Sequence, residues 1–285
     1  IINAAGGNAL GENKLLQIVV FSLFFGVALG SLGKAGQTLQ DMIEQLSHVM
    51  IKITGYVMVF APFAVFAAMA SAVASQGLGI LLTYFKFMGS FYLALTVLWL
   101  LLVLVGYVFL HKRIFKLLRE IKEAFFLSFA TASSEAAYPK ILDALDRFGV
   151  SRKISSFVMP LGYSFNLDGS MMYCAFASIF IAQVYGIDMP VGTQIAMLLT
   201  LMVTSKGMAG IPSASLVVIA GTLAQFGLPV EGMVLILGID RFLDMGRSAT
   251  NAVGNSIASA VIGKWEGELL SEQDAEIRHA VIKAD

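Results

Sequence analysis

LGIDRFLDMGRSATNAVGN, residues 237–255, places four charged side chains inside an otherwise apolar run that covers residues 234–262. Five polar side chains of this run follow one another at spacings of 4, 3, 4 and 4 residues: Asp240, Asp244, Arg247, Asn251 and Asn255. On an α-helix this spacing keeps all five within an arc of about 80°. A charge at the centre of a bilayer costs at least about 2.5–3.5 kcal/mol, so such side chains must pair or face a polar cavity.

Two interpretations of this polar stripe differ in function. In the first, an internal Asp244–Arg247 pair only holds the helix in place. In the second, the planar guanidinium of Arg247 binds an anionic ligand. The internal pair accounts for two residues but leaves the two amides and Asp168 without a reason to face inward, which favours ligand binding. Arg241 lies off the stripe and receives no role.

The composition of the chain indicates lipid rather than water as its main solvent. Of 285 residues, 58% are hydrophobic and 13% are charged, whereas a soluble domain carries about 25% charged residues. The net charge of +0 gives no indication of a nucleic-acid partner. The single cysteine, Cys174, excludes a disulfide framework. The three histidines lie in polar flanks, so the apolar segments hold no Ser/His dyad or His-rich metal site, and we expect neither an enzyme nor a cofactor.

Apolar segments and basic flanks together predict a topology. Segments that can enter a bilayer cover residues 15–32, 49–74, 81–110, 125–130, 157–184, 195–203, 216–223 and 234–262. Lysine and arginine cluster in residues 111–122, in residues 140–153 and after Lys264, but are absent from residues 75–78, 185–192 and 225–232. The positive-inside rule places the basic segments in the cytoplasm. The sequence therefore predicts a multi-pass protein of the cell (inner or plasma) membrane with a cytoplasmic C-terminus.

Four interruptions of the apolar segments predict the functional core. They are ATASSEAAYP (130–139), FNLDGS (165–170), SKGMAGIPSAS (205–215) and DMGRSATN (244–251). Because the short segment at Ser133 has basic flanks on both sides and that at Gly210 has none, the two are expected to be re-entrant hairpins of opposite orientation. The alternation of hairpin and broken helix predicts inverted repeats around a transport site. Kinked helices in a packed bundle would explain one interruption, but not four in this order.

The interruption at FNLDGS carries hard oxygen ligands for a small cation. Asn166 and Asp168 supply an amide and a carboxylate, and the broken backbone frees carbonyl oxygens. Gly162 and Ser164, just before them, could add backbone oxygens. The sequence therefore predicts a cation site here.

At SSEAAYP (133–139), PLGYSFNLDGS (160–170), SKGMAGIP (205–212) and the 237–255 stretch, the chain resembles the dicarboxylate/amino acid:cation symporter family, which includes the glutamate transporters. The resemblance covers residues 1–265. It implies an all-α integral membrane protein with inverted repeats, broken helices and two re-entrant helical hairpins. The family has eight membrane helices, and this chain resembles helices four to eight, so helices one to three are expected to be missing.

The resemblance also implies an elevator mechanism on a trimeric scaffold in the lipid bilayer. Residues 1–75 would be the remaining scaffold (trimerisation) helices, residues 76–265 the transport core and residues 266–285 a cytoplasmic tail. The protein is therefore expected to be a homotrimeric secondary active symporter.

The substrate site implied by the resemblance centres on Arg247, which would hold the side-chain carboxylate of an acidic small molecule. Asp244 would hold the ammonium group. The residues that would complete the site are Ser133, Ser134, Gly210, Ser248 and Asn251. Because C4-dicarboxylates have no ammonium, Asp244 favours glutamate or aspartate. The segments YSFNLDGS, SSE and SKG resemble the dicarboxylate branch, so a succinate-like substrate stays open. An anion channel, a further alternative, would need a continuous polar pore.

The coupling cation stays open between Na+ and H+. Sodium-coupled members carry methionine where this chain has Leu167, and aspartate where it has Asn255. The remaining sodium ligands would be Gly162, Ser164, Asn166, Asp168, Asn251, Asn255 and carbonyls around Ser205. Glu135, at the first hairpin tip, is a candidate proton carrier, although it could equally face cytoplasmic water.

Overall fold

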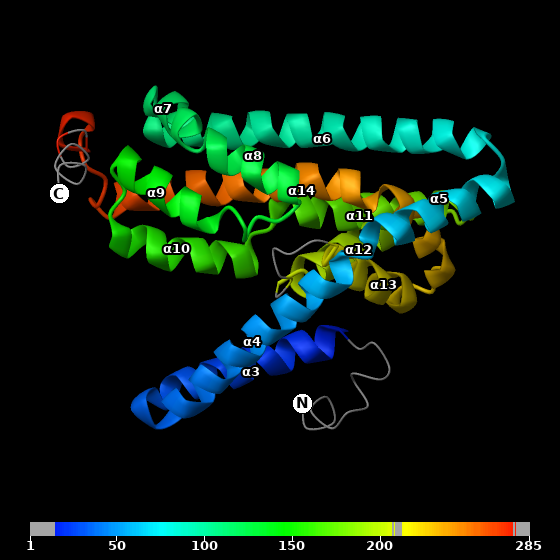
Figure 1. The fold of residues 1–285 in the computed structure, drawn as a ribbon, viewed down its shortest axis with the longest axis horizontal. Helices are drawn as coiled ribbons and strands as arrows, with labels where there is room; N and C mark the ends of the chain where they lie inside the picture. The colour runs from blue at the N-terminus through cyan, green and yellow to red at the C-terminus, as the bar shows by residue number, and fades with distance from the viewer. Residues whose placement is uncertain (1–14, 207, 209–212, 276, 278–285) are drawn as a thin grey trace. The chain divides into compact units, whose positions relative to one another are not determined.

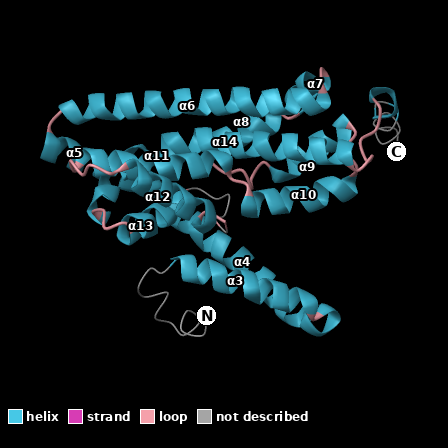
Figure 2. Ribbon diagram, turned by 180° about the vertical axis from the view of Figure 1, so that it is seen from behind, coloured by secondary structure: helices cyan, strands magenta, loops and turns pink. Residues whose placement is uncertain are grey.

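The computed structural model describes residues 15–206, 208, 213–275 and 277, and every regular element among them is a helix (Figures 1 and 2). The helices are α3 (Leu15–Ser31), α4 (Gln37–Met58), α5 (Ala61–Gln76), α6 (Gly79–Leu110), α7 (Arg113–Glu120), α8 (Lys122–Thr131), α9 (Tyr138–Phe148), α10 (Arg152–Phe165), α11 (Asp168–Val184), α12 (Val191–Thr204), α13 (Ser215–Gln225) and α14 (Met233–Trp265), with 3-10 turns η1 (Gly33–Gly36) and η2 (Val230–Gly232). The predicted all-α class is confirmed.

The chain forms two compact units, each assembled from separate stretches. The first unit comprises Ile1–Ile80, Ala177–Gly207 and Leu216–Ile239, and the second comprises Leu81–Phe176, Met208–Ser215 and Asp240–Asp285. Helices α11 and α14 therefore contribute to both units. The polar stripe of α14 and the segment around Asp168 belong to the second unit.

The first unit corrects one predicted span. The sequence predicts one helix over residues 49–74, whereas α4 ends at Met58 and α5 begins at Ala61. Pro62 lies in the first turn of α5. Its ring lacks an N–H group and clashes with the carbonyl four residues earlier, so a helix that reaches this proline is broken just before it. The prediction of one uninterrupted span is therefore wrong.

Two described segments are long and apolar enough to cross a membrane. One is α6, Gly79–Leu110, and the other is Arg152–Val184, which joins α10 and α11 across two non-helical residues. Most of the apolar window of α6 is exposed on the molecule. Large apolar side chains on that surface include Leu93, Leu100 and Leu104.

The second unit also contains α9, which packs against α7, α8 and α10. The buried side of α9 consists of Ile141, Leu142, Ala144, Leu145 and Phe148. Burying a large aliphatic or aromatic side chain stabilises a fold by about 1.5–3 kcal/mol. Gly149 ends the helix in the left-handed region, with φ of 106°, which glycine adopts without strain. Helix α9 thereby positions the segment that precedes it, where the first hairpin tip was predicted.

Three of the four predicted interruptions are present among the described residues. Helix α8 ends at Thr131, and Ala132 follows with a left-handed φ of 52°. Asn166 and Leu167 separate α10 from α11. The third interruption lies between α12 and α13, although residues 207 and 209–212, including the predicted ligand Gly210, lie outside the described residues.

The fourth predicted interruption is wrong, because α14 is continuous through DMGRSATN. Its charged side chains pair with one another on the helix surface, so the backbone hydrogen bonds need not open. Gly246 costs roughly 1 kcal/mol relative to alanine in a helix. Here it makes room for a neighbour, because a β-carbon at Gly246 would lie 2.8 Å from Cε1 of Tyr92 on α6.

Candidate functional site

A buried charged triad forms the centre of the site on α14. Arg247 is 1% exposed, and Asp240 and Asp244 are each 2% exposed. Arg247 Nε donates to Asp244 Oδ1 at 2.7 Å, and Nη1 donates to Asp240 Oδ1 at 3.0 Å. The prediction that the stripe faces inward is confirmed. The sequence interpretation paired Arg247 with Asp244 alone, whereas the structure adds Asp240 as a second partner.

The remaining nitrogen of the guanidinium is buried without a hydrogen-bond partner. Among the described residues, Arg247 Nη2 has neither solvent contact nor an acceptor. The Tyr173 ring of α11 lies against the guanidinium, with 4.2 Å between Cζ and the ring centroid. A desolvated cation–π contact of this kind is worth about 2 kcal/mol. Arg247 is thus held on three sides while one strong donor stays available for a ligand.

Ser213, which the sequence interpretation passed over, binds both carboxylates. Its backbone N–H donates to Asp244 Oδ2 at 2.6 Å, and its hydroxyl donates to Asp240 Oδ2 at 2.7 Å. Ser213 adopts a left-handed φ of 61°, which is uncommon for serine. Ser213, shortly before α13, therefore contacts both carboxylates of the triad. One sequence feature could have pointed to Ser213, because it is a serine directly after Pro212 in a predicted hairpin tip. However, nothing in the sequence says which serine of that tip reaches α14.

A second polar cluster lies at the interruption between α10 and α11. Asn166 Nδ2 donates to Asp168 Oδ2 and to Asn255 Oδ1, each at 3.3 Å. Gly162 packs so tightly on Asn255 that any β-carbon there would overlap the Asn255 amide. The structure therefore brings together four of the predicted cation ligands, namely Gly162, Asn166, Asp168 and Asn255. Ser164 is exposed on α10 and is not part of this cluster.

Asn251 and Gly169 join the two polar regions. Gly169 N donates to Asn251 Oδ1 at 2.9 Å, and Asn251 Nδ2 donates to Ser170 Oγ at 3.0 Å. A β-carbon at Gly169 would lie 2.6 Å from the carbonyl oxygen of Arg247 and 2.8 Å from its Cα. Only glycine lets the start of α11 approach the backbone of α14 this closely.

The segment that the sequence predicts as the first hairpin tip is partly buried, and it is bound to α14 by a residue to which the sequence interpretation gave no role. Ser133 and Ser134 are buried, and Glu135 is half-buried. The residue that reaches this tip is Arg241, whose Nη2 donates to the carbonyl of Thr131, the last residue of α8, at 3.0 Å. Arginine is well suited to the free carbonyls and negative end of a helix C-terminus. The sequence did hold a signal here, because a charge in an apolar run must find a partner.

The other predicted ligands lie as follows. Ser248 is buried, and its hydroxyl donates to Asp244 Oδ1 at 3.3 Å. Ser133 and Ser134 are not among the Arg247 partners that the structure gives. Ser205 follows α12 in the first unit, where its hydroxyl donates to the Met202 carbonyl at 3.5 Å.

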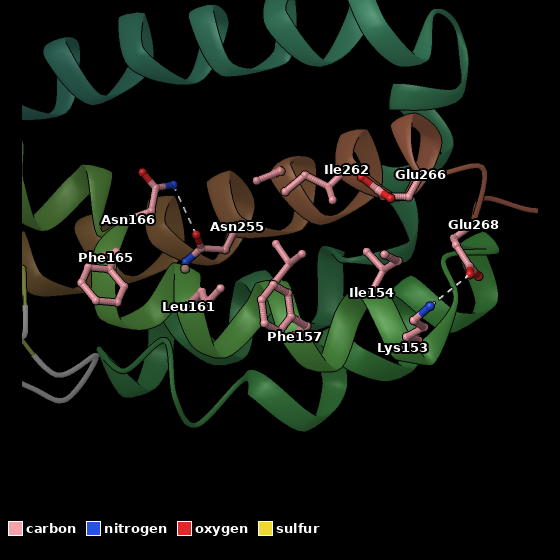
Figure 3. A pocket seen from close by; sticks show the side chains of 13 residues that line it. Lys153, Ile154, Phe157, Leu161, Phe165, Asn166, Asn255, Ile262, Glu266 and Glu268 are labelled. Atoms are coloured by element: carbon pink, nitrogen blue, oxygen red, sulfur yellow. Dashed lines mark hydrogen bonds and ion pairs between the residues drawn. The ribbon is translucent and has the colours of Figure 1, made fainter. Parts of the chain in front are cut away.

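A cavity of about 620 Å³ lies between α10 and α14. Asn166 and Asn255 lie at one end of it, and a polar group that includes Lys153 and Glu268 lies at the other (Figure 3). Lys153 Nζ and Glu268 Oε1 are 3.9 Å apart. Apolar side chains line the middle, including Phe157 of α10. The cavity therefore reaches the polar cluster from the end of the unit where α10 begins.

Comparison with known proteins identifies the family of the chain. The profile of the sodium:dicarboxylate symporter family matches residues 2–265. The chain belongs to this family. It is 43% identical over 266 residues to a proton/sodium-glutamate symport protein of Geobacillus stearothermophilus, which covers 93% of this chain and 63% of that protein. It is 43% identical over 265 residues to C4-dicarboxylate transport protein 2 of Polaromonas naphthalenivorans (strain CJ2), covering 92% and 59%. It is 42% identical over 267 residues to a proton/glutamate-aspartate symporter of Escherichia coli (strain K12), covering 90% and 59%.

Membership of the sodium:dicarboxylate symporter family confirms the predicted family and places the chain among membrane transport proteins. The family consists of symporters rather than enzymes. The chain spans about three fifths of the length of the curated relatives that it matches.

Proposed function

We propose that the protein is a secondary active symporter that moves glutamate or aspartate across a membrane together with a cation, Na+ or H+. The observation that carries this proposal is Arg247, which is buried and keeps one unpartnered guanidinium nitrogen beside two carboxylates. A substrate carboxylate is the natural acceptor for that donor. The ammonium of an amino acid would bind the carboxylate of Asp244, which already accepts hydrogen bonds from Arg247 and Ser248.

The charge of the site is the physical reason for cation coupling. Two carboxylates and one guanidinium leave the buried triad with a formal charge of −1, since −2 + 1 = −1. Asp168 adds a further carboxylate nearby. A glutamate or aspartate brings another negative charge, and burying an uncompensated charge in low dielectric is costly. Each cation that binds with the substrate offsets one of these negative charges and so lowers this penalty.

For sodium, the proposed ligands are oxygens of Gly162, Asn166, Asp168, Asn251 and Asn255, all in the second unit. These are the hard ligands that small cations prefer. The cavity between α10 and α14 offers that cluster a route to one end of the second unit. For H+, the proposed carrier is Glu135, half-buried at the first tip.

For the architecture, we propose two re-entrant hairpins in inverted repeats, with the tips at Ser133–Ser134 and at Gly210. Residues 1–75 would form the scaffold, residues 76–265 the core that moves as an elevator, and residues 266–285 a cytoplasmic tail of a multi-pass, homotrimeric protein. The three helix interruptions and the basic flanks support this proposal. The mass of the purified protein in detergent should be three times that of one chain, and a monomer would reject the trimer.

A second candidate substrate is a C4-dicarboxylate such as succinate. The specific observation in its favour is the 43% identity to C4-dicarboxylate transport protein 2 of Polaromonas naphthalenivorans (strain CJ2). In that case Asp244 would face a carboxylate rather than an ammonium group. The coupled cation would then have to offset the repulsion between these two negative charges.

The deciding experiment is uptake into proteoliposomes that contain the protein. Labelled aspartate, glutamate and succinate are each offered under an imposed Na+ gradient, an imposed H+ gradient or neither. We expect aspartate or glutamate to accumulate only when one of the gradients is present. Accumulation of succinate alone would reject the amino-acid assignment, and equilibration without a gradient would reject symport.

Gly169→Ala is expected to lower initial uptake at least about tenfold. The added methyl would meet the Arg247 backbone, so α11 and α14 must separate, and overpacking of this kind costs about 1–3 kcal/mol. The matched control is Gly192→Ala on α12, where a β-carbon would meet nothing within 4 Å. Rates are normalised to inserted protein. Equal uptake by the two variants would show that the close approach at Gly169 is not needed.

Arg241→Ala is expected to raise the KM for substrate about tenfold with a smaller change in maximal rate. The variant removes a charge-assisted hydrogen bond to the Thr131 carbonyl, worth about 1.5–3 kcal/mol, and so frees the first tip. Arg241→Lys, which keeps a donor and the charge, should recover part of the affinity. Arg119→Ala removes an exposed arginine from α7 and is the control. A KM unchanged from the Arg119→Ala value would exclude this role for Arg241.

A further inference from the structure

A cavity of about 560 Å³ lies where α6 ends and α7 begins, and we name it the basic pocket. It lies wholly within the second unit. Four basic side chains from two distant parts of the chain line it, together with Tyr107 and Leu110: His111, Lys112, Arg113 and Lys264. Among the described residues no carboxylate belongs to the lining. The transport site proposed above uses none of these residues.

The basic pocket lies at the end of α6, whose apolar surface is largely exposed. Helix α6 is apolar enough to cross a bilayer and ends at Leu110, directly before the basic residues. An aromatic pair marks the same end, because the Phe109 and Trp265 rings are 5.2 Å apart in an edge-on arrangement and Trp265 is exposed. Tryptophan and tyrosine concentrate at the membrane–water interface. The pocket is therefore expected at the depth of the lipid head groups.

Internal contacts fix part of the pocket and leave donors for a ligand. Lys264 Nζ donates to the Phe109 carbonyl at 2.5 Å, one of the three donors of an ammonium group. Arg113 Nη2 donates to the Phe148 and Leu270 carbonyls at 3.3 and 3.0 Å. Its Nε lies 3.5 Å from Glu272 Oε1, so one acid offsets part of the charge. Lys112 is exposed and adds a further ammonium.

We propose that the basic pocket binds the phosphate group of an anionic phospholipid. Several cations around one cavity stabilise a lipid head group with a net negative charge more than a zwitterionic head group, whose own ammonium already balances its phosphate. Basic pockets at the ends of membrane helices favour anionic lipids for this reason. Tyr107, which is exposed, offers the adjoining acyl chains apolar contact. The lipid would anchor the junction of α6 and α7, a role separate from substrate transport.

The test uses Trp265 as a reporter of the lipid beside the pocket. Trp99→Phe leaves Trp265 as the remaining tryptophan of the chain's two. The protein is reconstituted in phosphatidylcholine vesicles with increasing fractions of brominated phosphatidylglycerol, and in a parallel series with brominated phosphatidylcholine. Quenching of Trp265 gives the relative binding constant of the two lipids. We expect the Trp99→Phe protein to bind phosphatidylglycerol at least about fivefold more tightly than phosphatidylcholine. When Lys112→Gln and Lys264→Gln are added to this protein, the preference should be lost.

The control removes the same charge outside the basic pocket. Lys140→Gln/Lys153→Gln changes two exposed lysines and should keep the preference. Equal quenching by both lipids in the parent, or an equal loss in the control, would overturn the proposal. The series is repeated in inorganic phosphate and in chloride at one ionic strength. Loss of the preference in phosphate but not in chloride would show that free phosphate displaces the lipid, and would overturn the commitment of the pocket to a lipid head group. Because the readout is lipid affinity, its failure is distinguishable from a failure of the transport proposal.

Discussion

Replacing Arg247 by alanine is expected to lower glutamate and aspartate uptake at least about 100-fold. The variant deletes the donor that we assign to the substrate carboxylate. It also leaves Asp240 and Asp244 buried without their counter-charge, and breaking a buried pair costs about 3–5 kcal/mol. The measurement is the initial rate into proteoliposomes under the effective cation gradient, normalised to inserted protein. Near-normal uptake would reject the site.

Arg247→Lys separates loss of binding from loss of folding. Lysine keeps a positive charge beside the two carboxylates, so the thermal unfolding temperature in detergent should stay close to that of the parent. It lacks the planar fork that serves Asp240, Asp244 and a ligand at once, so uptake should still fall at least about tenfold. A folded Lys variant with parental uptake would show that a point charge suffices, and the assignment of the free Nη2 to substrate would be wrong.

The polar stripe of α14 shows how far the sequence alone can lead. Helical spacing and the cost of charge in an apolar run correctly predicted that the stripe is buried. The same residues were wrongly interpreted as a break. A continuous helix whose polar side chains pair with one another and a helix broken at polar residues can have the same amino-acid composition. Only the backbone conformation in the structure distinguishes the two. At Asn166 and Leu167 the break is present, although Pro160 also lies within α10 without ending it.

The contacts that complete the triad could not be predicted, because they depend on how distant segments pack. Tyr173 lies 74 residues before Arg247 in the chain, since 247 − 173 = 74. Ser213 reaches Asp240 and Asp244 from the turn between two short helices. No periodicity links such positions. Arg241 is different, because a charge in an apolar run needs a partner and the sequence alone shows that need. The structure identifies the partner as the carbonyl at the end of α8.

Asp240 changes how the electrostatics of Asp244 are understood. If Asp244 were the only partner of Arg247, the pair would be neutral, and binding an ammonium would compete directly with the guanidinium. With Asp240 on Nη1, Arg247 keeps a compensating carboxylate even while Asp244 turns toward a ligand. Asp244 also accepts the backbone N–H of Ser213. In the role that we propose for Asp244, an ammonium would replace one of its present donors, and Asp240 would keep Arg247 compensated meanwhile.

Asp244→Asn is expected to weaken aspartate much more than succinate. The amide keeps the shape of the side chain but loses the charge that an ammonium needs, and a charge-assisted hydrogen bond is worth about 1.5–3 kcal/mol. The concentration of aspartate that half-saturates uptake should rise about 10- to 100-fold. Competition by succinate should change less than about fivefold, because succinate has no ammonium and loses a repulsive neighbour.

Asp240→Asn is the matched control for this prediction, since it removes the same formal charge from the other side of Arg247. If the ratio of aspartate to succinate affinity falls only in Asp244→Asn, the effect belongs to a direct contact with the ammonium. If both variants lower the ratio equally, the cause is the net charge of the triad. Equal loss of aspartate and succinate in Asp244→Asn would remove the ammonium role altogether, and would make the site one for dicarboxylates in which Asp244 only orients Arg247.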